Sequence, residues 1–153
     1  MKEQYNELKE DVLAEEKAID ETIERLREIR WKFDSQKQDN LIEPAMGTYL
    51  MNFYNGIENI LKRVSKEYYS FMPKGNSWHK ELLVLSYNAP ERKIPIFDQG
   101  IASRVIPYKN FRHRFVSGYG FQLKGEKMLV LIDNVEELWN DIKKTISEFF
   151  DKL

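Results

Sequence analysis

Residues 8–33 read LKEDVLAEEKAIDETIERLREIRWKF, and this stretch decides the fold. One stripe of residues recurs at alternating steps of four and three positions. Charged residues occupy most of the positions outside this stripe. The stripe consists of Leu8, Val12, Glu15, Ile19, Thr22, Leu26, Ile29 and Phe33. This spacing predicts one long amphipathic helix that buries the stripe in a helical bundle; a separate coiled coil for a partner is the alternative.

A second long helix is predicted after the polar connection SQKQDN at residues 35–40. Apolar residues recur every three or four positions from Ile42 to Phe71, and Pro73 and Gly75 then end the run. Two antiparallel helices of about thirty residues, each about 45 Å long at 1.5 Å per residue, already indicate a bundle.

Two further helices are predicted from their caps. Ser77 is a candidate N-cap for a short helix through Leu85. Asp98 is a candidate N-cap for the next helix, within which Pro107 requires a kink or a restart because proline removes a backbone donor. This helix should end near residues 118–120, where glycine can adopt the left-handed conformation.

A last helix is predicted from about Asn134 to Phe150, again with its apolar residues on one face. Residues 128–132 are apolar enough to be misread as a strand, but no convincing strand pair is present. Together these patterns predict a single all-α domain over residues 1–153, an up-and-down helical bundle of about five helices.

Composition excludes several classes of function. The chain has 153 residues and no cysteine, which excludes disulfides, thiolate metal sites and a cysteine nucleophile. No stretch approaches the roughly 18 apolar residues of a membrane span, and the charged N-terminus lacks the apolar segment of a signal peptide. A cytoplasmic protein without a membrane partner is therefore expected.

Neither a cofactor nor a metal ion is expected. The sequence has no glycine loop for phosphates, no nucleophile elbow and no clustered carboxylates of the kind a metal-dependent nuclease needs. His79 and His113 are too far apart in sequence to form a metal motif. We interpret His79, which follows Trp78, as a structural side chain at a helix start.

Charge is distributed unevenly along a chain whose formal net charge is -1. Residues 1–34 hold eleven acids and seven bases, whereas residues 101–125 hold five bases and no acid. Within the latter, Arg112 offers a two-pronged phosphate ligand and His113 an imidazole that titrates near neutral pH. This basic segment is the candidate site.

Two other interpretations of the basic segment remain open at this point. Its helix face is either solvated or paired with the acidic first helix. Glu58, which lies in an otherwise apolar and aromatic stretch, is a candidate buried partner for Arg112 or Arg104.

Residues 111–123, FRHRFVSGYGFQL, resemble the signature of HEPN-domain proteins of the HepT type. That family's motif is an arginine, four residues, a histidine, one residue and a tyrosine, which correspond here to Arg112, position 117 and Tyr119. Residues 49–58 and 78–83 also look like HepT stretches, so the resemblance runs from about residue 40 to the end.

The resemblance implies metal-independent RNA cleavage. Arg112 would hold the phosphate, while the histidine moves protons as the ribose 2′-hydroxyl attacks. The basic segment itself adds Arg114 and Lys109 as further RNA-binding candidates. Position 117 is Ser117, however, and a hydroxyl without a pKa near neutrality cannot serve as general acid or base unaided. Loss of activity is the direct interpretation; His113, one turn earlier on the same strip of helix, is the candidate substitute.

The resemblance also implies partners. HepT proteins are toxins that are commonly encoded beside an antitoxin, a nucleotidyltransferase of the MNT type, which attaches AMP to the tyrosine that corresponds to Tyr119. HEPN proteins usually form homodimers whose two motif helices face one cleft. The alternatives are that Tyr119 only packs at the helix end, and that the chain is an inactive HEPN module that binds RNA or a protein, or a structural adaptor.

Overall fold

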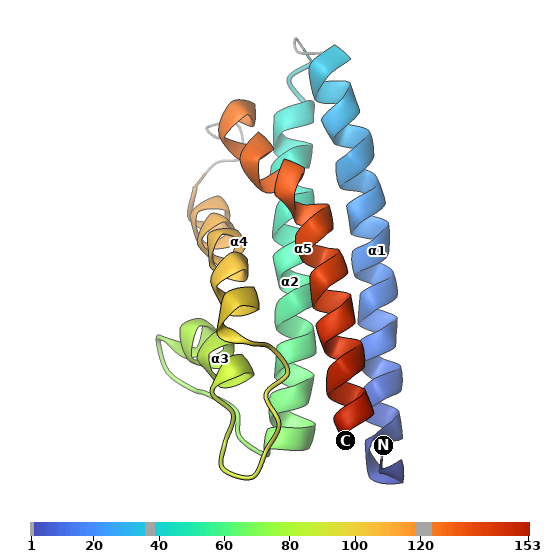
Figure 1. The fold of residues 1–153 in the computed structure, drawn as a ribbon. Coiled ribbons are helices and arrows are strands. Elements are labelled where there is room, and N and C mark those ends of the chain that lie inside the picture. The colour runs from blue at the N-terminus through green and yellow to red at the C-terminus, as the bar shows by residue number, and fades with distance from the viewer. Residues whose placement is uncertain (1, 36–38, 119–123) are drawn as a thin grey trace.

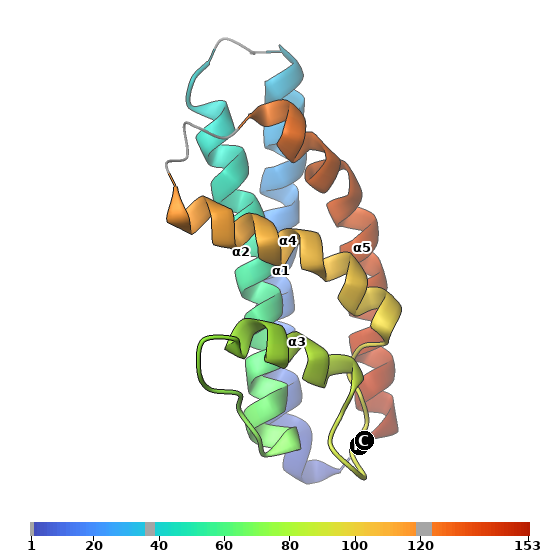
Figure 2. The ribbon, with the colours of Figure 1, turned by 90° about the vertical axis from the view of Figure 1, so that its left-hand side faces the viewer.

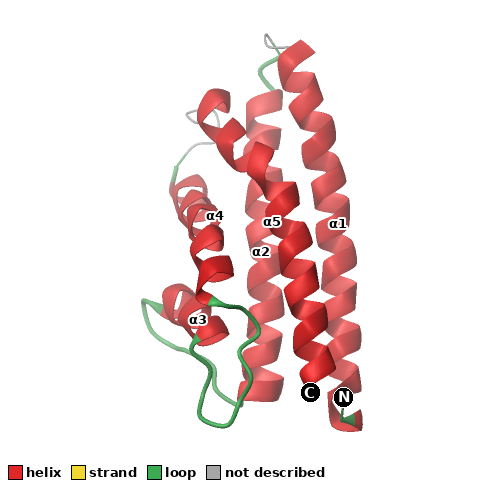
Figure 3. Cartoon of the chain, in the orientation of Figure 1, coloured by secondary structure: helices red, strands yellow, loops and turns green. Residues whose placement is uncertain are grey.

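The structure is a computed structural model that describes residues 2–35, 39–118 and 124–153. Every regular element in these ranges is helical, and Figure 3 shows no strand in them. The elements are η1 (Glu3–Tyr5), α1 (Asn6–Ser35), α2 (Ile42–Val64), η2 (Ser65–Tyr69), α3 (Trp78–Tyr87), α4 (Gln99–Ser117) and α5 (Gly125–Lys152). The predicted all-α bundle of about five helices is confirmed.

Three long helices form the body of the molecule. In Figure 1, α1, α2 and α5 stand side by side, with α1 antiparallel to the other two. The shorter α3 and α4 lie together on one face of this body, and Figure 2 shows α4 running obliquely across α2 and α5. Both termini lie at the same end, where the Lys2 backbone N–H donates to the Leu153 carbonyl at 3.3 Å.

The predicted stripe of α1 faces the core. Its apolar members are all buried, and Ile23 is buried as well, whereas Glu15 and Thr22 are partly exposed. Gly56 of α2 brings the two helices close together, because a Cβ there would lie 2.5 Å from Cγ1 of Ile19. The contact between α1 and α2 therefore depends on glycine at position 56, which has no side chain, as well as on the buried apolar side chains.

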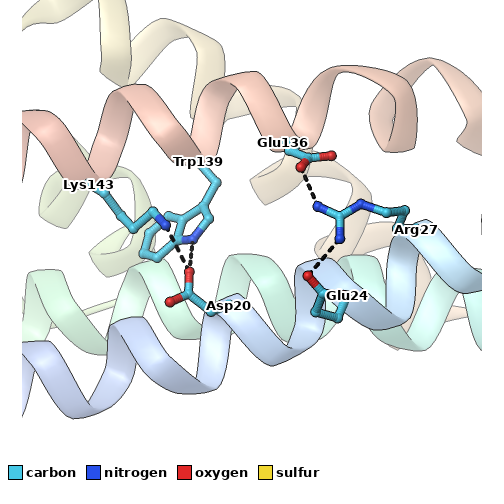
Figure 4. Close-up of polar contacts among 6 residues, drawn as sticks. All are labelled: Asp20, Glu24, Arg27, Glu136, Trp139 and Lys143. Atoms are coloured by element: carbon cyan, nitrogen blue, oxygen red, sulfur yellow. Dashed lines mark hydrogen bonds and ion pairs between the residues drawn. The ribbon is translucent and has the colours of Figure 1, made fainter.

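Charged contacts join the outer edges of α1 and α5 (Figure 4). Asp20 accepts hydrogen bonds from Nε1 of Trp139 at 2.7 Å and from Nζ of Lys143 at 3.0 Å. Arg27 pairs with Glu24 on its own helix and with Glu136 on α5. Such exposed ion pairs contribute at most about 1 kcal/mol each, so the apolar core dominates the stability.

The second helix ends earlier than predicted. Its α-helical part stops at Val64, a π-helical turn covers Ser65–Tyr69, and Ser70 takes the left-handed conformation at φ 58°. Phe71 therefore lies beyond the helix and is 56% exposed. The apolar spacing continues past the end of α2 because the aromatic residues of the π-helical turn contact the loop between α3 and α4.

The tyrosines of the π-helical turn hold the loop between α3 and α4. The Tyr69 hydroxyl donates to the Ile94 carbonyl at 3.0 Å and accepts from the Ile96 N–H at 3.0 Å. The Tyr68 hydroxyl accepts from the Ile94 N–H at 2.9 Å. These bonds satisfy backbone groups of the loop that lie outside the helices, and they hold the loop that leads into α4.

The fourth helix is continuous from Gln99 to Ser117. It passes through Pro107 without a restart, although the helix loses one backbone donor there. Gly118 follows it in an extended conformation, φ −130° and ψ −169°, so the predicted end is confirmed but not the left-handed cap. Ser77 occupies the N-cap of α3 as predicted, but its side chain forms no capping hydrogen bond.

The last helix begins at Gly125, well before the predicted Asn134. Glu43 of α2 explains the early start, because its Oε2 accepts from the Gly125 N–H at 2.5 Å and caps the helix from another element. The apolar residues 128–132 are then part of α5, where Met128 and Ile132 are buried on the core face.

Asp98 caps α4 as predicted, because its carboxylate accepts from the Ile101 N–H at 2.7 Å. We expect Asp98→Ala to lower the free energy of unfolding by about 1 kcal/mol, the usual cost of a lost N-cap. Asp98→Asn, which can also accept this bond, should lose only a few tenths of that amount. Urea unfolding measures both, and equal stability of Asp98→Ala and the parent chain would contradict the capping role.

No helix in the described part of the chain is long and apolar enough to cross a membrane.

Candidate functional site

A pocket of about 300 Å³ lies where α2, α3 and α4 meet. Its wall carries cations, imidazoles and neutral polar groups, and none of the residues that line it is an acid. The lining residues are Tyr54, Asn76, Ser77, His79, Lys80, Lys109, Asn110, Arg112 and His113. The composition favours a small anionic group, such as a phosphate.

Packing of α4 on α2 positions Arg112. Gly47 of α2 admits the Phe115 ring, since a Cβ there would lie 2.5 Å from Cε2 of that ring. Two turns further along α2, Oδ1 of Asn55 accepts from Nε of Arg112 at 2.6 Å. Among the described residues nothing accepts from the two terminal nitrogens of Arg112, so that end of the guanidinium can still take a two-pronged ligand.

The acidic first helix does not neutralise the site. The carboxylates of α1 pair within α1 or with α2 and α5, as in the contacts of Asp20 and of Asp11 with Arg63. In the ranges that the structure describes, no carboxylate pairs with Lys80, Lys109 or Arg112. Pairing with α1, one of the two alternatives from the sequence, is therefore wrong.

Glu58 is buried beneath the pocket but does not serve the arginines. It is 3% exposed. Its Oε2 accepts from the Tyr54 hydroxyl at 2.8 Å and contacts Nδ1 of His79 at 2.6 Å, while Nζ of Lys62 lies 3.8 Å from Oε1. The prediction of a partnership with Arg112 or Arg104 was wrong, because helical spacing turns Glu58 toward α3 rather than α4.

Arg104 instead pairs with an acid of α5, Oδ2 of Asp141, at 2.8 Å. It lines a second pocket of about 470 Å³ between α4 and α5, next to Tyr108. Burial raises the pKa of Tyr108, which keeps its hydroxyl protonated to donate to the Leu131 carbonyl at 2.6 Å. Arg104 therefore lies on the same helix as Arg112 but at a different place.

His79 is held from two directions. Its Nδ1 meets the buried carboxylate of Glu58, and its ring lies against the Trp78 ring with 3.6 Å between centroids and 30° between planes. The side chain keeps 32% exposure and lines the pocket. The interpretation of His79 as a structural residue at a helix start accounts for its contacts with Glu58 and Trp78. It did not predict that His79 also lines the pocket.

The other predicted site residues divide into two groups. Lys109, Arg112 and His113 line the pocket together. Ser117 does not line it; its hydroxyl donates to the His113 carbonyl at 2.8 Å, one turn back. Arg114 is exposed and also lies outside the lining.

Tyr119 lies outside the described residues, so its predicted place beside Arg112 stays a prediction.

Sequence reasoning missed several lining residues because they come from two other elements. Tyr54 was visible only as a polar group one turn before Glu58 in an apolar helix. Asn76 was visible only as a turn residue, and Ser77 only as the N-cap candidate of the helix that follows it. No spacing rule within one helix connects these residues to Arg112.

The comparisons with known proteins agree with this architecture. A family model described as HepT-like protein matches residues 45–153, which run from within α2 to the end of the chain. No curated protein and no solved structure matches significantly. The match covers the helix that carries Arg112 and the parts of the other two helices that complete the pocket, and it confirms the predicted resemblance to the HepT-like family. The chain belongs to the HepT-like family.

Proposed function

We propose that this chain binds RNA and that the pocket around Arg112 holds a phosphodiester of the bound strand. The observation that carries the proposal is the pocket itself, in which Lys80, Lys109 and Arg112 meet without an acidic lining residue. Three cations converging on one hollow favour a polyanion, and RNA is the polyanion that the family resemblance implies.

The arrangement suits a phosphate in its details. Asn55 holds Nε of Arg112, so the guanidinium is oriented before any ligand arrives. Asn76 and Ser77, which precede α3, line the pocket, and the partial positive charge of a helix N-terminus favours an anion there. Asn110 adds a neutral hydrogen-bonding group that can contact a ribose.

We further propose that the chain is a member of a toxin–antitoxin type system and descends from metal-independent endoribonucleases. Its family supports this origin, and Ser117 in place of the motif histidine marks the departure from it. An inactive HEPN module that binds RNA or a protein is the alternative. A small nucleotidyltransferase gene next to this one would favour the toxin–antitoxin setting.

A homodimer is the expected assembly, with two α4 helices facing each other. Supporting it, Ile106 and Val116 of α4 are exposed by 41% and 54%. A second copy packed along α4 would remove these two side chains from water. An MNT-type antitoxin that modifies Tyr119 would add negative charge near the basic segment and weaken RNA binding. Light scattering and intact mass after incubation with the nucleotidyltransferase and ATP test the two proposals.

The test of RNA binding compares two arginines of one helix. Arg112→Ala should weaken binding of a single-stranded RNA of randomised sequence by about 10-fold to 100-fold, the value of one charge-assisted phosphate contact. It should also lower the slope of log K against log salt by about one. Fluorescence anisotropy over a salt series measures both quantities.

Arg104→Ala is the matched control, because it removes the same charge from α4 at a position paired with Asp141. Its RNA affinity should stay within about twofold of the parent, as expected for an exposed cation outside the contact. Equal losses in Arg104→Ala and Arg112→Ala would mean that only overall charge matters. Salt-insensitive binding, or none, would refute the proposed function.

A further inference from the structure

We propose that His79, oriented by Glu58, is the proton-transfer group of the Arg112 pocket, the task that the family motif gives to position 117. This inference rests on the proposed function, because it assigns chemistry to an RNA strand bound by Arg112. It starts from a juxtaposition that the sequence did not indicate: the buried carboxylate of Glu58, the imidazole of His79 and the guanidinium of Arg112, which come from three helices.

Geometry determines which ring nitrogen of His79 is available. Burial, and then the charge of Glu58, raise the pKa of Tyr54, so its hydroxyl stays protonated and donates to Oε2 of Glu58. The same oxygen lies 2.6 Å from Nδ1 of His79, and because a carboxylate oxygen only accepts, we assign the donor of this hydrogen bond to Nδ1–H. With Nδ1–H committed to the carboxylate, the neutral ring has its lone pair on Nε2.

The His79–Glu58 pair has the construction expected of a general base. A carboxylate that accepts from one imidazole nitrogen fixes the tautomer and the ring orientation, and it stabilises the imidazolium when the other nitrogen takes a proton. Trp78 holds the ring from its face. Glu58 is a positioning residue in this scheme, and His79 is the group that meets the substrate.

The two other candidates for proton transfer lack such support. His113 lines the pocket but is exposed, and no described residue forms a hydrogen bond, an ion pair or a ring contact with its imidazole. Ser117 lies outside the lining and donates its hydroxyl to the helix backbone. A base must be held within reach of the proton it removes, and His79 is the imidazole that its surroundings hold.

The proposed step is a transesterification. Nε2 of His79 takes the proton of a ribose 2′-hydroxyl as the 2′-oxygen bonds to phosphorus, while Arg112 holds the phosphate oxygens. The bond from phosphorus to the 5′-oxygen breaks, and that oxygen takes a proton from water. The resulting hydroxide is neutralised by the proton on His79, which leaves a 2′,3′-cyclic phosphate, a 5′-hydroxyl end and the unchanged protein.

The experiment measures cleavage of an end-labelled, single-stranded RNA of randomised sequence by the purified chain, with a chelator present to suppress metal-dependent contaminants. We expect the parent chain to yield 2′,3′-cyclic phosphate ends. His79→Ala should lower kcat by about 10²-fold to 10⁴-fold, the contribution of a general base, with KM changed less than about threefold. Added imidazole should restore part of the rate in this variant.

His79→Asn separates chemistry from structure. Its amide can donate to Glu58 in place of Nδ1–H, which preserves the buried contact, but nothing replaces Nε2. We expect His79→Asn to fold and bind RNA like the parent and to cleave as poorly as His79→Ala. Glu58→Gln should lower kcat without weakening RNA binding, and Arg104→Ala should cleave like the parent.

Each other outcome has a definite meaning. Full cleavage by His79→Asn would overturn the proposal and leave His79 a structural residue. Cleavage lost only in His113→Ala, or gained only in Ser117→His, would move proton transfer to that position and also overturn it. RNA binding by a parent chain that does not cleave would overturn the role of His79 while the proposed RNA binding stands; absence of binding would refute both.

Discussion

Trp139→Ala should lower the free energy of unfolding by about 3–5 kcal/mol, the usual cost of truncating a buried tryptophan. Trp139 is 1% exposed and packs edge-to-face on Phe53, with ring centroids 6.3 Å apart. Its Nε1 also donates to Asp20, so the substitution opens a cavity in α5 and removes the hydrogen bond to α1 (Figure 4). Urea unfolding followed by circular dichroism measures the loss.

Two variants separate the contributions at Trp139. Trp139→Phe keeps much of the packing but lacks the indole donor, and it should lose about 1–2 kcal/mol. Trp31→Ala makes the same truncation on α1 at a residue that is 65% exposed, and it should change stability by less than about 0.5 kcal/mol. Similar losses at Trp31 and Trp139 would contradict the buried packing of Trp139 against α2.

Glu58→Ala should lower the free energy of unfolding by about 2–4 kcal/mol, although it removes a charge from the interior. The alanine leaves the buried Tyr54 hydroxyl without its acceptor, and unsatisfied buried donors are costly. His79 and Lys62 also lose their carboxylate, but both are partly exposed and water can replace it in part. Thermal and urea unfolding at neutral pH measure the loss.

Two variants serve as controls for Glu58→Ala. Glu58→Gln keeps the volume and an acceptor oxygen, so it should lose only about 1 kcal/mol. Glu67→Ala removes an exposed acid from η2 and should be nearly neutral. If Glu58→Ala were as stable as Glu67→Ala, the buried contacts of Tyr54 and His79 would contribute nothing measurable.

Local periodicity predicted the helices well where one helix buries one face. The stripe from Leu8 to Phe33 and the cap at Asp98 appear in the structure as expected. These features depend on neighbours within about four residues, which is the range that a sequence pattern can show. The interiors of the helices were therefore more predictable than their ends.

The ends that were misplaced depend on distant residues. The start of α5 at Gly125 needs the carboxylate of Glu43, and the π-helical turn after Val64 directs two tyrosine hydroxyls to the loop at Ile94 and Ile96. Neither partner can be read from spacing along one helix. Tertiary hydrogen bonds changed the boundary in both places.

The sequence by itself determined the all-α class, the amphipathic faces and a basic segment centred on Arg112, because these are properties of composition and of helical period. Only the tertiary structure decided which side chains surround that arginine. It placed His79 in the pocket with Lys109 and Arg112, and it left Ser117 outside. The physical reason is that a pocket forms where separate helices meet, and the crossing of α4 over α2 is set by packing at Gly47 rather than by local preference.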